Sequence, residues 1–327
     1  MNVWKHKDLI SLSGLSAEEL WFLLGAAKAF KGLRGDRVNS VPTLQGKALV
    51  NFFVEPSTRT RISFELAALR LGANVINVSA TMSSLQKGET LKDTALSLEA
   101  LHADMIVLRH GSAGAAQLLA KYLRSSSVIN AGDGAHEHPT QGLLDGFTIW
   151  EKHGRLEDLR VAIVGDILFS RVARSNIHLL VKLGAKVTLV GPSTLVPREF
   201  EAMGVRITHR MEDILETTDV LSLLRIQYER QCREYFPSVK EYISLFGLTK
   251  QRAARLKSSC LVMHPGPVKR GIEVDSEVAD GAKSVILEQV ANGLAVRTAV
   301  LYACGGGSAE YRGKKLMKQS GLMLTGL

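Results

Sequence analysis

The chain has 327 residues, of which 46% are hydrophobic and 22% are charged, a globular composition large enough for two cores. The net charge is +9 without an interleaved basic and aromatic stripe, which argues against nucleic acid and favours anionic small molecules, although a solvated basic surface gives the same charge. No apolar run approaches the ~20 residues that span a bilayer, and the start lacks a signal peptide's apolar segment, so we expect a cytoplasmic protein without membrane association.

Short apolar runs rich in β-formers alternate along the chain with longer segments of helical periodicity. A capping box of Ser16 and Glu19 marks the first helix. Further helices are expected to begin at about Ser57, Leu91, Ala113, Pro139, Ser170 and Ser284. Strands are predicted at Ala48–Phe53, Asn74–Val78, Asp104–Leu108, Val128–Asn130, Val161–Val164, Lys186–Val190, Val205–Thr208, Val220–Leu223 and Cys260–Met263. This alternation predicts an α/β fold with two Rossmann-like domains, each a mostly parallel sheet flanked by helices.

The alternation also predicts how the domains are divided along the chain. Residues 1–140 are expected to form the first domain, with a C-terminal helix at 286–304 packing back on it. Residues 150–285 are expected to form the second, and helix Pro139–His153 to bridge the two. Residues 305–327 resemble a mobile tail. Because parallel strands present ligand-binding groups at their carboxyl ends, the loops after the strands are the places to look for chemistry.

Several signals of other protein classes are absent from the sequence. It has no G-x-G-x-x-G, no G-x-x-x-x-G-K-[ST] and no G-x-S-x-G motif, which argues against dinucleotide, Walker-type and serine-hydrolase sites. Cys232, Cys260 and Cys304 are too few and too widely spaced for a disulfide framework or a cysteine zinc site. His136 and His138 flank Glu137, but no further ligand cluster accompanies this pair. We therefore expect no metal and no cofactor.

The turn after the first strand has the composition of an anion site. Ser57-Thr58-Arg59-Thr60 lies between the strand Ala48–Phe53 and a helical segment, so Ser57 is placed to cap that helix. Free backbone N–H groups, the positive end of the helix, three hydroxyls and the fork of Arg59 would surround one point that suits phosphate. The alternative is a capped helix with surface arginines, but the density of Ser, Thr and Arg favours an anion site.

The run Phe53-x-Glu55-x-Ser57-Thr58-Arg59-Thr60-Arg61 resembles the carbamoyl-phosphate motif of the aspartate and ornithine carbamoyltransferases. Other motifs extend the resemblance from about Leu9 to Ala303. In that family this loop binds the phosphate of carbamoyl phosphate. The resemblance therefore implies that Ser57, Thr58, Arg59 and Thr60 are phosphate ligands.

Three other polar segments match the family's carbamoyl-phosphate site. Arg109 follows the third predicted strand, where a rim salt bridge is the alternative, and the resemblance places it at the carbonyl oxygen and phosphate. His138 and Gln141 lie in a His-Pro-Thr-Gln signature whose His and Gln contact the carbamoyl carbonyl and amide. Ser83 and Lys87 lie in what would otherwise be a surface loop. The family's similar loop reaches into the neighbouring subunit's site and contacts phosphate and substrate there.

The second half of the chain resembles the aspartate enzymes more than the ornithine enzymes. Arg171 matches the family's arginine that holds substrate aspartate, and Arg225 and Gln227 in R-x-Q-x-E-R match a dicarboxylate site. Pro265 and Gly266 match a loop whose backbone carbonyls meet the attacking amine, and the resemblance also implies that these two residues bind carbamoyl phosphate. The resemblance implies transfer of the carbamoyl group from carbamoyl phosphate to L-aspartate, an early step of pyrimidine synthesis.

The resemblance also implies how the reaction proceeds and how the chain assembles. Arg59, Thr60, Lys87, Arg109 and His138 are expected to act by positioning and by preorganised charge, with Lys87 supplied by a neighbour in a homotrimer. A regulatory chain or a dihydroorotase-like chain is a candidate for further assembly. Two alternatives stay open: another carbamoyltransferase of the ornithine type, and a non-catalytic carbamoyltransferase-like scaffold for a dihydroorotase-like partner.

Overall fold

The computed structural model describes residues 4–32, 42–79, 88–227, 230, 235 and 238–306. Ser83, Lys87, Cys232 and the predicted tail from residue 307 onward lie outside this part of the chain. The chain divides into two compact units: unit 1 comprises residues 1–143 and 291–327, and unit 2 comprises residues 144–290. Both divisions fall inside helices, the first in α5 (Pro139–His153) and the second in α10 (Ile286–Cys304).

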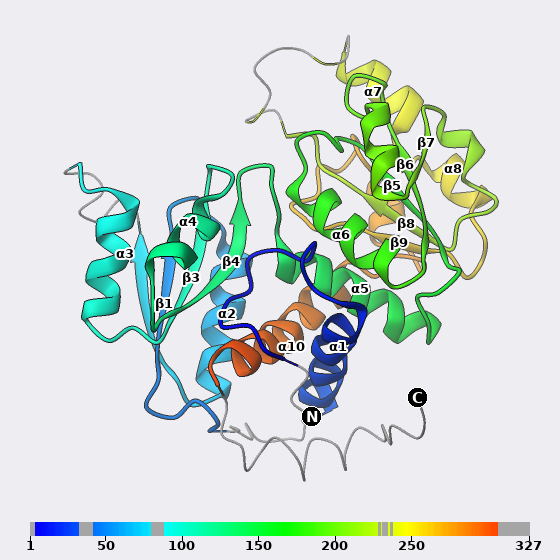
Figure 1. Cartoon of the computed structure of the whole chain (residues 1–327). Coiled ribbons are helices and arrows are strands. Elements are labelled where there is room, and N and C mark those ends of the chain that lie inside the picture. The colour runs from blue at the N-terminus through cyan, green and yellow to red at the C-terminus, as the bar shows by residue number, and fades with distance from the viewer. Residues whose placement is uncertain are drawn as a thin grey trace. The chain divides into compact units, whose positions relative to one another are not determined.

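Unit 1 is built on a four-stranded parallel sheet with the order β2-β1-β3-β4 (Figure 1). Its strands are β1 (Ala48–Phe53), β2 (Asn74–Ser79), β3 (Met105–His110) and β4 (Ser127–Asp133). The chain leaves β1 first for β2 on one side and then for β3 on the other. The strand order therefore reverses between β1 and β3, and the loops after these two strands diverge at their carboxyl ends. Ligands of open α/β sheets bind at such a switch point.

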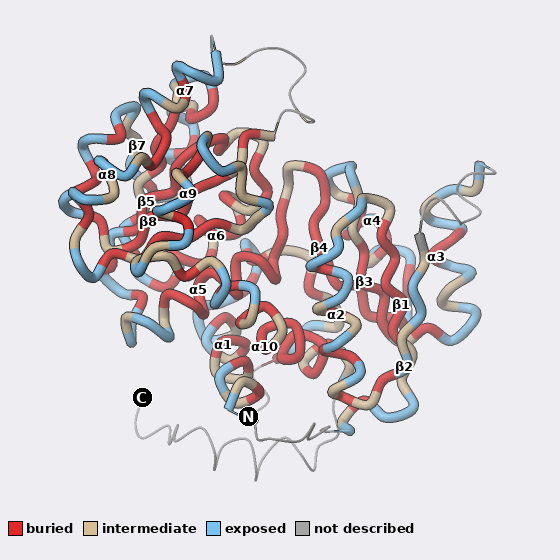
Figure 2. The backbone as a smooth tube through the Cα atoms, turned by 180° about the vertical axis from the view of Figure 1, so that it is seen from behind, coloured by how far each residue is buried: buried red, intermediate tan, exposed pale blue. Residues whose placement is uncertain are grey.

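Helices cover both faces of this sheet. They are α1 (Ala17–Gly32), α2 (Thr58–Arg70), α3 (Leu91–Ala100) and α4 (Ala115–Tyr122), with α10 from the end of the chain. Phe52 and Ile106 of the strands form a core with Ala95 of α3 and Leu119 of α4. Helix α2 packs against β1 and β2. In Figure 2 strands β1, β3 and β4 are largely buried, whereas edge strand β2 and the outer sides of the covering helices are exposed or partly exposed.

Unit 2 contains a five-stranded parallel sheet with the order β7-β6-β5-β8-β9. Its strands are β5 (Arg160–Val164), β6 (Lys186–Val190), β7 (Arg206–Thr208), β8 (Val220–Leu223) and β9 (Leu261–Met263). Strand β5 pairs with β6 on one side and with β8 on the other. A second switch point therefore lies at the carboxyl ends of β5 and β8.

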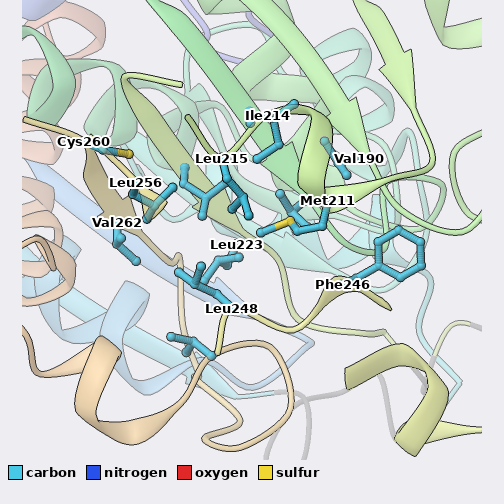
Figure 3. Packing of buried hydrophobic residues seen from close by; sticks show 14 of the residues in the cluster. Val190, Met211, Ile214, Leu215, Leu223, Phe246, Leu248, Leu256, Cys260 and Val262 are labelled. Atoms are coloured by element: carbon cyan, nitrogen blue, oxygen red, sulfur yellow. The ribbon is translucent and has the colours of Figure 1, made fainter. Parts of the chain in front are cut away.

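The helical elements of unit 2, besides parts of α5 and α10, are α6 (Arg171–Lys182), η3 (Arg198–Met203), η4 (Met211–Asp213), α7 (Val239–Phe246), α8 (Lys250–Arg255) and α9 (Ser276–Ala279). Figure 3 shows one core of this unit, where Leu223 and Val262 from the sheet pack with Met211, Phe246 and Leu256. This burial fixes the strands whose ends carry the polar residues described below.

The predicted fold class is confirmed, and each predicted strand is present with its ends shifted by at most three residues. Helix α5 has the predicted bounds, and the Ser16–Glu19 capping box forms through reciprocal bonds of 2.8 and 3.2 Å. Helices α7, α8 and α9 were not predicted, since they have only 8, 6 and 4 residues and show no long apolar stripe. No described helix is long and apolar enough to cross a membrane.

Candidate active site

The amino-terminal end of α2 carries concentrated positive charge. The helix begins at Thr58, and its first turn contains Arg59 and Arg61 but no acidic residue. The free N–H groups at this end already carry a partial positive charge, so two added cations are unfavourable there without an anion. Thr58 and Arg59 are exposed, so an anion from solvent has access to them. The end of α2 therefore has the electrostatics of an anion site.

The predicted capping role of Ser57 is wrong in its details. Ser57 occupies the cap position with an extended backbone (φ −162°, ψ 102°), but its side chain makes no capping bond to the helix backbone. The hydroxyl instead donates to Thr60 Oγ1 at 3.0 Å. The two hydroxyls are thus held against each other on one side of the first turn. The side chain of Ser57 therefore does not cap the backbone N–H groups at the start of α2.

Arg109 is anchored on both sides of the switch point of unit 1. It lies inside β3 rather than after it, because β3 continues to His110. Its Nη2 atom is 2.6 Å from Glu55 Oε1, and its Nη1 atom donates to the carbonyl of Ala131 at 3.1 Å. Its own carbonyl accepts the N–H groups of Val54 and Glu55. Arg109 thus joins the turn after β1 to the end of β4.

A buried carboxylate organises the loop that leads to His138. Asp133 has no exposed surface, and its Oδ2 atom accepts the N–H of Gly114 at 2.7 Å. Its Oδ1 atom accepts Asn130 Nδ2 at 2.8 Å and the N–H of Glu137 at 3.2 Å. These bonds fix both ends of the loop between β4 and α5.

His138 and Gln141 follow this loop at the start of α5. Both are buried, and the N–H of Gln141 donates to the carbonyl of His138 at 2.9 Å. Neighbouring His136 lies 3.0 Å from Asp133, so His136 has a structural partner. No group of three or more His, Cys, Asp or Glu that could hold a metal occurs among the residues with described positions.

One buried carboxylate also spans the switch point of unit 2. Asp166 follows β5 and has no exposed surface. Its Oδ1 atom accepts the N–H of Phe169 at 3.1 Å, and its Oδ2 atom accepts the N–H of Gln227 at 3.0 Å. Gly165 permits this approach, because a Cβ atom there would lie 2.9 Å from the carbonyl oxygen of Leu224. Asp166 therefore holds the segments after β5 and β8 together.

The predicted aspartate ligands lie on these two segments. Arg171 is buried and begins α6, whose cap Ser170 accepts the N–H of Ala173 at 3.1 Å. On the other segment, Arg225 Nη2 donates to Gln227 Oε1 at 3.2 Å, and Gln227 Nε2 donates to the carbonyl of Arg225 at 3.1 Å. These mutual bonds restrict both side chains.

Two further arginines add positive charge to the same segments. Arg230 Nη1 donates to the carbonyl of Phe169 at 3.1 Å, and Arg174 Nη1 donates to the carbonyl of Leu168 at 3.0 Å. Burial lowers the pKa of Arg174, while the charge of Asp166 raises it. These four arginines outnumber the two buried carboxyl groups that bond to the segments, Asp166 and Glu273, and leave this end of the sheet cationic, which suits a dicarboxylate ligand.

The loop after β9 contains Pro265 and Gly266, both half-buried. Its conformation is fixed locally, because the N–H of Gly266 donates to His264 Nδ1 at 2.8 Å. Gly266 has a φ of +68°, a left-handed conformation that favours glycine. The remaining predicted residues, Ser83 and Lys87, lie outside the described part of the chain.

Sequence reasoning missed the acidic residues that hold these loops. Asp133 and Asp166 each follow a glycine at the end of a buried strand, in Gly132-Asp133 and Gly165-Asp166. That pattern is the signal that could have identified them. The pairing of Glu55 with Arg109 has no comparable local signal, because the two residues are 54 positions apart.

The sequence matches known families over both halves. Residues 7–151 match the family described as "Aspartate/ornithine carbamoyltransferase, carbamoyl-P binding domain", and residues 157–304 match "Aspartate/ornithine carbamoyltransferase, Asp/Orn binding domain". The chain belongs to the aspartate/ornithine carbamoyltransferase family.

Individual relatives indicate which enzyme of this family the chain resembles. The chain is 56% identical over 307 residues to the aspartate carbamoyltransferase catalytic subunit of Opitutus terrae, covering 94% of this chain and 98% of the relative. It is 53% identical over 302 residues to the catalytic subunit of the same name from Halothermothrix orenii, covering 92% and 96%.

Solved structures of an aspartate enzyme and of an ornithine enzyme share the fold of this chain. Aspartate transcarbamoylase from Trypanosoma cruzi, in complex with carbamoyl phosphate and aspartate, superposes with a TM-score of 0.83 at 30% identity, covering 92% of this chain and 98% of that one. Ornithine carbamoyltransferase from Pyrococcus furiosus has a TM-score of 0.81 at 33% identity, covering 92% and 97%. The fold therefore does not separate the two substrates, whereas the sequence relatives above 50% identity do.

Proposed function

We propose that this enzyme binds carbamoyl phosphate with residues of unit 1 and L-aspartate with residues of unit 2. The chain catalyses transfer of the carbamoyl group of carbamoyl phosphate to the amine of L-aspartate, giving N-carbamoyl-L-aspartate and phosphate (EC 2.1.3.2) in pyrimidine synthesis. One observation supports the assignment of one substrate to each unit: each sheet has one cationic switch point. The first lies beside α2 and the second beside Asp166.

Carbamoyl phosphate is proposed to bind at the end of α2. Ser57, Thr58, Arg59 and Thr60 would contact the phosphate, which completes the helix end that Ser57 leaves uncapped. Arg109 would bridge phosphate and carbonyl oxygen. His138 would donate to the carbonyl and Gln141 would contact the amide. The roles of Ser83 and Lys87 rest on the motif resemblance alone.

The chemistry follows from this placement. The amine of aspartate attacks the carbamoyl carbon and a tetrahedral intermediate forms. Phosphate then leaves with the electrons of the broken C–O bond and takes up the proton that the amine loses. Arg109, His138 and Thr60 would stabilise the developing oxyanion, and the loss of one such donor typically costs about 10²–10³ in rate. The carbonyls of Pro265 and Gly266 would accept hydrogen bonds from the attacking amine. No covalent enzyme intermediate is needed.

The preference for aspartate over ornithine has an electrostatic basis in unit 2. Arg171, Arg225 and Gln227 would hold the two carboxylates. The cationic side chain of ornithine would instead face Arg225 and Arg230, and such like-charge contact selects against the wrong substrate. The positive charge of these arginines therefore disfavours the ornithine-type alternative.

Substitution of Arg225 tests this function. Arg225→Ala should raise the KM for aspartate by about tenfold or more, because a charge-assisted bond to carboxylate is lost. Carbamoyl-phosphate binding should stay near normal. Arg198→Ala, at an exposed position in η3, is the matched control and should match wild type. An equal loss of affinity for both substrates would contradict the assignment of Arg225 as an aspartate ligand. Turnover of ornithine in place of aspartate would support the ornithine-type alternative.

We also propose a homotrimer. Ile62, Leu66 and Leu69 form an apolar stripe along α2 with exposures of 44%, 45% and 54%, and Ile76 on edge strand β2 is 52% exposed. Asn77 of β2 donates to Glu65 of α2 at 3.3 Å, and Ile76 points to the opposite face of the sheet, so the stripe on α2 and Ile76 are two separate exposed apolar sites. Adjacent exposed apolar residues of this kind mark protein interfaces. A trimeric arrangement is what the family resemblance implies, and a regulatory or dihydroorotase-like chain stays a candidate for further assembly.

A further inference from the structure

A chain of buried hydrogen bonds inside unit 2 ends at the loop after β9. The N–H of His264 donates to Gln289 Oε1 at 2.9 Å, and Gln289 Nε2 donates to Asp145 Oδ1 at 2.8 Å. The second oxygen of Asp145 accepts Asn176 Nδ2 at 2.9 Å. All four residues are at most 2% exposed. These hydrogen bonds link the loop after β9 through α10 and α5 to α6. None of the four side chains has a role in the chemistry proposed above.

The carboxylate of Asp145 determines which groups donate and which accept along this series of hydrogen bonds. Each oxygen of Asp145 accepts a side-chain amide N–H, from Gln289 and from Asn176. An ionised carboxylate only accepts hydrogen bonds, so it forces Gln289 to direct its NH₂ group toward Asp145. The Gln289 carbonyl oxygen must then face the N–H of His264. Asp145 therefore sets the amide orientation that holds His264 in place.

His264 provides a second constraint through its ring. Because the N–H of Gly266 donates to Nδ1 at 2.8 Å, Nδ1 carries no proton and the ring is neutral, with its proton on Nε2. The Nε2 atom faces Glu273 Oε2 at 3.8 Å. The carbonyl of Pro265 and the N–H of Gly266 belong to one planar trans peptide unit and point in opposite directions. The bond to Nδ1 therefore aims the Pro265 carbonyl away from the ring.

We propose that Asp145, Gln289 and His264 are positioning residues that aim the backbone carbonyl of Pro265 at the attacking amine of the substrate. Gln289 fixes the start of the loop at the His264 N–H, and the His264 ring fixes the peptide unit that contains the Pro265 carbonyl. This inference rests on the proposed role of Pro265 and Gly266. The residues act through the loop backbone and do not touch the reacting atoms.

A pair of substitutions at His264 separates positioning from packing. In His264→Asn the side-chain oxygen takes the place of Nδ1 and still accepts the N–H of Gly266. In His264→Gln the polar atoms lie near Nε2, so that bond is lost. His264→Gln should lower kcat by about 10²-fold, the loss expected from a misplaced reacting group, while His264→Asn should stay within about tenfold of wild type. Equal activity of the two variants would overturn the role of the ring.

The Gln289 bonds are tested separately. Gln289→Met keeps the length of the side chain and removes both bonds, so it should raise the KM for aspartate and lower kcat by about tenfold or more, with the Kd for carbamoyl phosphate unchanged. Asp145→Asn should change KM and kcat in the same direction. Its NH₂ group replaces one accepting oxygen of Asp145 and therefore faces a donor N–H of Gln289 or Asn176. Glu288→Gln is the matched control in α10, since it removes only the exposed ion pair with Lys152.

The outcomes distinguish this inference from the proposed function. Absence of wild-type turnover with carbamoyl phosphate and aspartate would overturn the function itself. Wild-type turnover together with unchanged kcat and KM in both Gln289→Met and His264→Gln would overturn only the positioning role. Thermal unfolding and the Kd for carbamoyl phosphate monitor folding. A variant that loses both folding and carbamoyl-phosphate binding would count against the role, because that pattern shows a general structural contribution.

Discussion

Arg109 and Glu55 are held in a closed arrangement of backbone and side chain. The carbonyl of Arg109 accepts the N–H of Glu55 at 3.3 Å, and the carboxylate of Glu55 returns to the Arg109 guanidinium at 2.6 Å. The side chains are 12% and 26% exposed, so the pair is only partly screened by water. The guanidinium is therefore oriented before substrate arrives, which reduces the reorganisation needed during the reaction.

Glu55→Gln should lower kcat by about tenfold, because a neutral amide holds the Arg109 guanidinium less strongly than a carboxylate does. Steady-state kinetics with both substrates would measure the change. Glu18→Gln, an exposed glutamate at the start of α1, is the control and should leave kcat unchanged. Unchanged kcat in Glu55→Gln would show that Arg109 does not depend on this partner.

Asp166→Asn should raise the KM for aspartate by about tenfold or more. Asparagine keeps one acceptor oxygen, so one of the N–H groups of Phe169 and Gln227 faces an NH₂ group, and a lost buried acceptor costs about 1–3 kcal/mol. Carbamoyl-phosphate affinity, measured by calorimetry, should be close to wild type. Asp158→Asn, which removes an exposed ion pair with Lys186, is the control. A weakened carbamoyl-phosphate affinity would contradict a role confined to unit 2.

Mixed oligomers test whether neighbouring chains share a site. Arg59→Ala and Lys87→Ala should each be nearly inactive alone, because each removes a cation from the phosphate site. If the loop that contains Lys87 enters the neighbour's site, every mixed trimer has one interface where both wild-type residues meet. Dissociating and mixing the two variants should then restore a sizeable fraction of wild-type activity. Hybrids detected by mass that show no gain in activity would exclude shared sites.

Glu273 gives the stability of unit 2 a distinct pH dependence. Burial raises the pKa of its carboxyl above the ordinary 4.5, although bonds from the N–H groups of Lys269 and Ile226 lower it. Below pH 4.5 the group is protonated in both the folded and the unfolded state. As pH rises through the folded pKa, the folded state must ionise a buried acid, so it loses stability.

Glu273→Gln should therefore gain stability relative to wild type as pH rises from 4.5 to 8, measured as urea midpoints at several pH values. Glu277→Gln is the matched control with the opposite sign, because a hydrogen bond from Lys250 lowers the pKa of exposed Glu277. Its effect should be small, since the pair is exposed. A stability difference between Glu273→Gln and wild type that is constant with pH would contradict the raised pKa.

Most of the strands were predicted well because they are buried on both faces and form continuous apolar runs. Arg160–Val164 and Val220–Leu223 show this, each lying within one residue of its predicted bounds. The sequence also located the α2 turn, since the density of Ser, Thr and Arg there is local information. Long-range relations could not be found this way. The Glu55–Arg109 pair and the link from His264 to Asp145 depend on which strands and helices become neighbours.

Strand ends were predicted less accurately, for a physical reason. Hydrophobicity stops at Leu108, but pairing of β3 continues to His110 because polar residues still form the backbone ladder. Arg109 therefore has the extended backbone of a strand and not that of a loop. The capping role of Ser57 was also wrong, because its hydroxyl bonds to the side chain of Thr60 and not to the backbone of the helix.

The position of the unit boundaries inside α5 and α10 has a consequence for synthesis on the ribosome. Unit 2 is one continuous stretch, residues 144–290, whereas unit 1 needs residues 291–304 to complete its core. The end of α10 bonds to β4 through Ser127 and the Cys304 carbonyl, and Arg297 of α10 lies over the ring of Phe64. The first half of the chain therefore emerges first but finishes folding last. A nascent chain stopped before residue 291 would leave unit 1 with an uncovered apolar face.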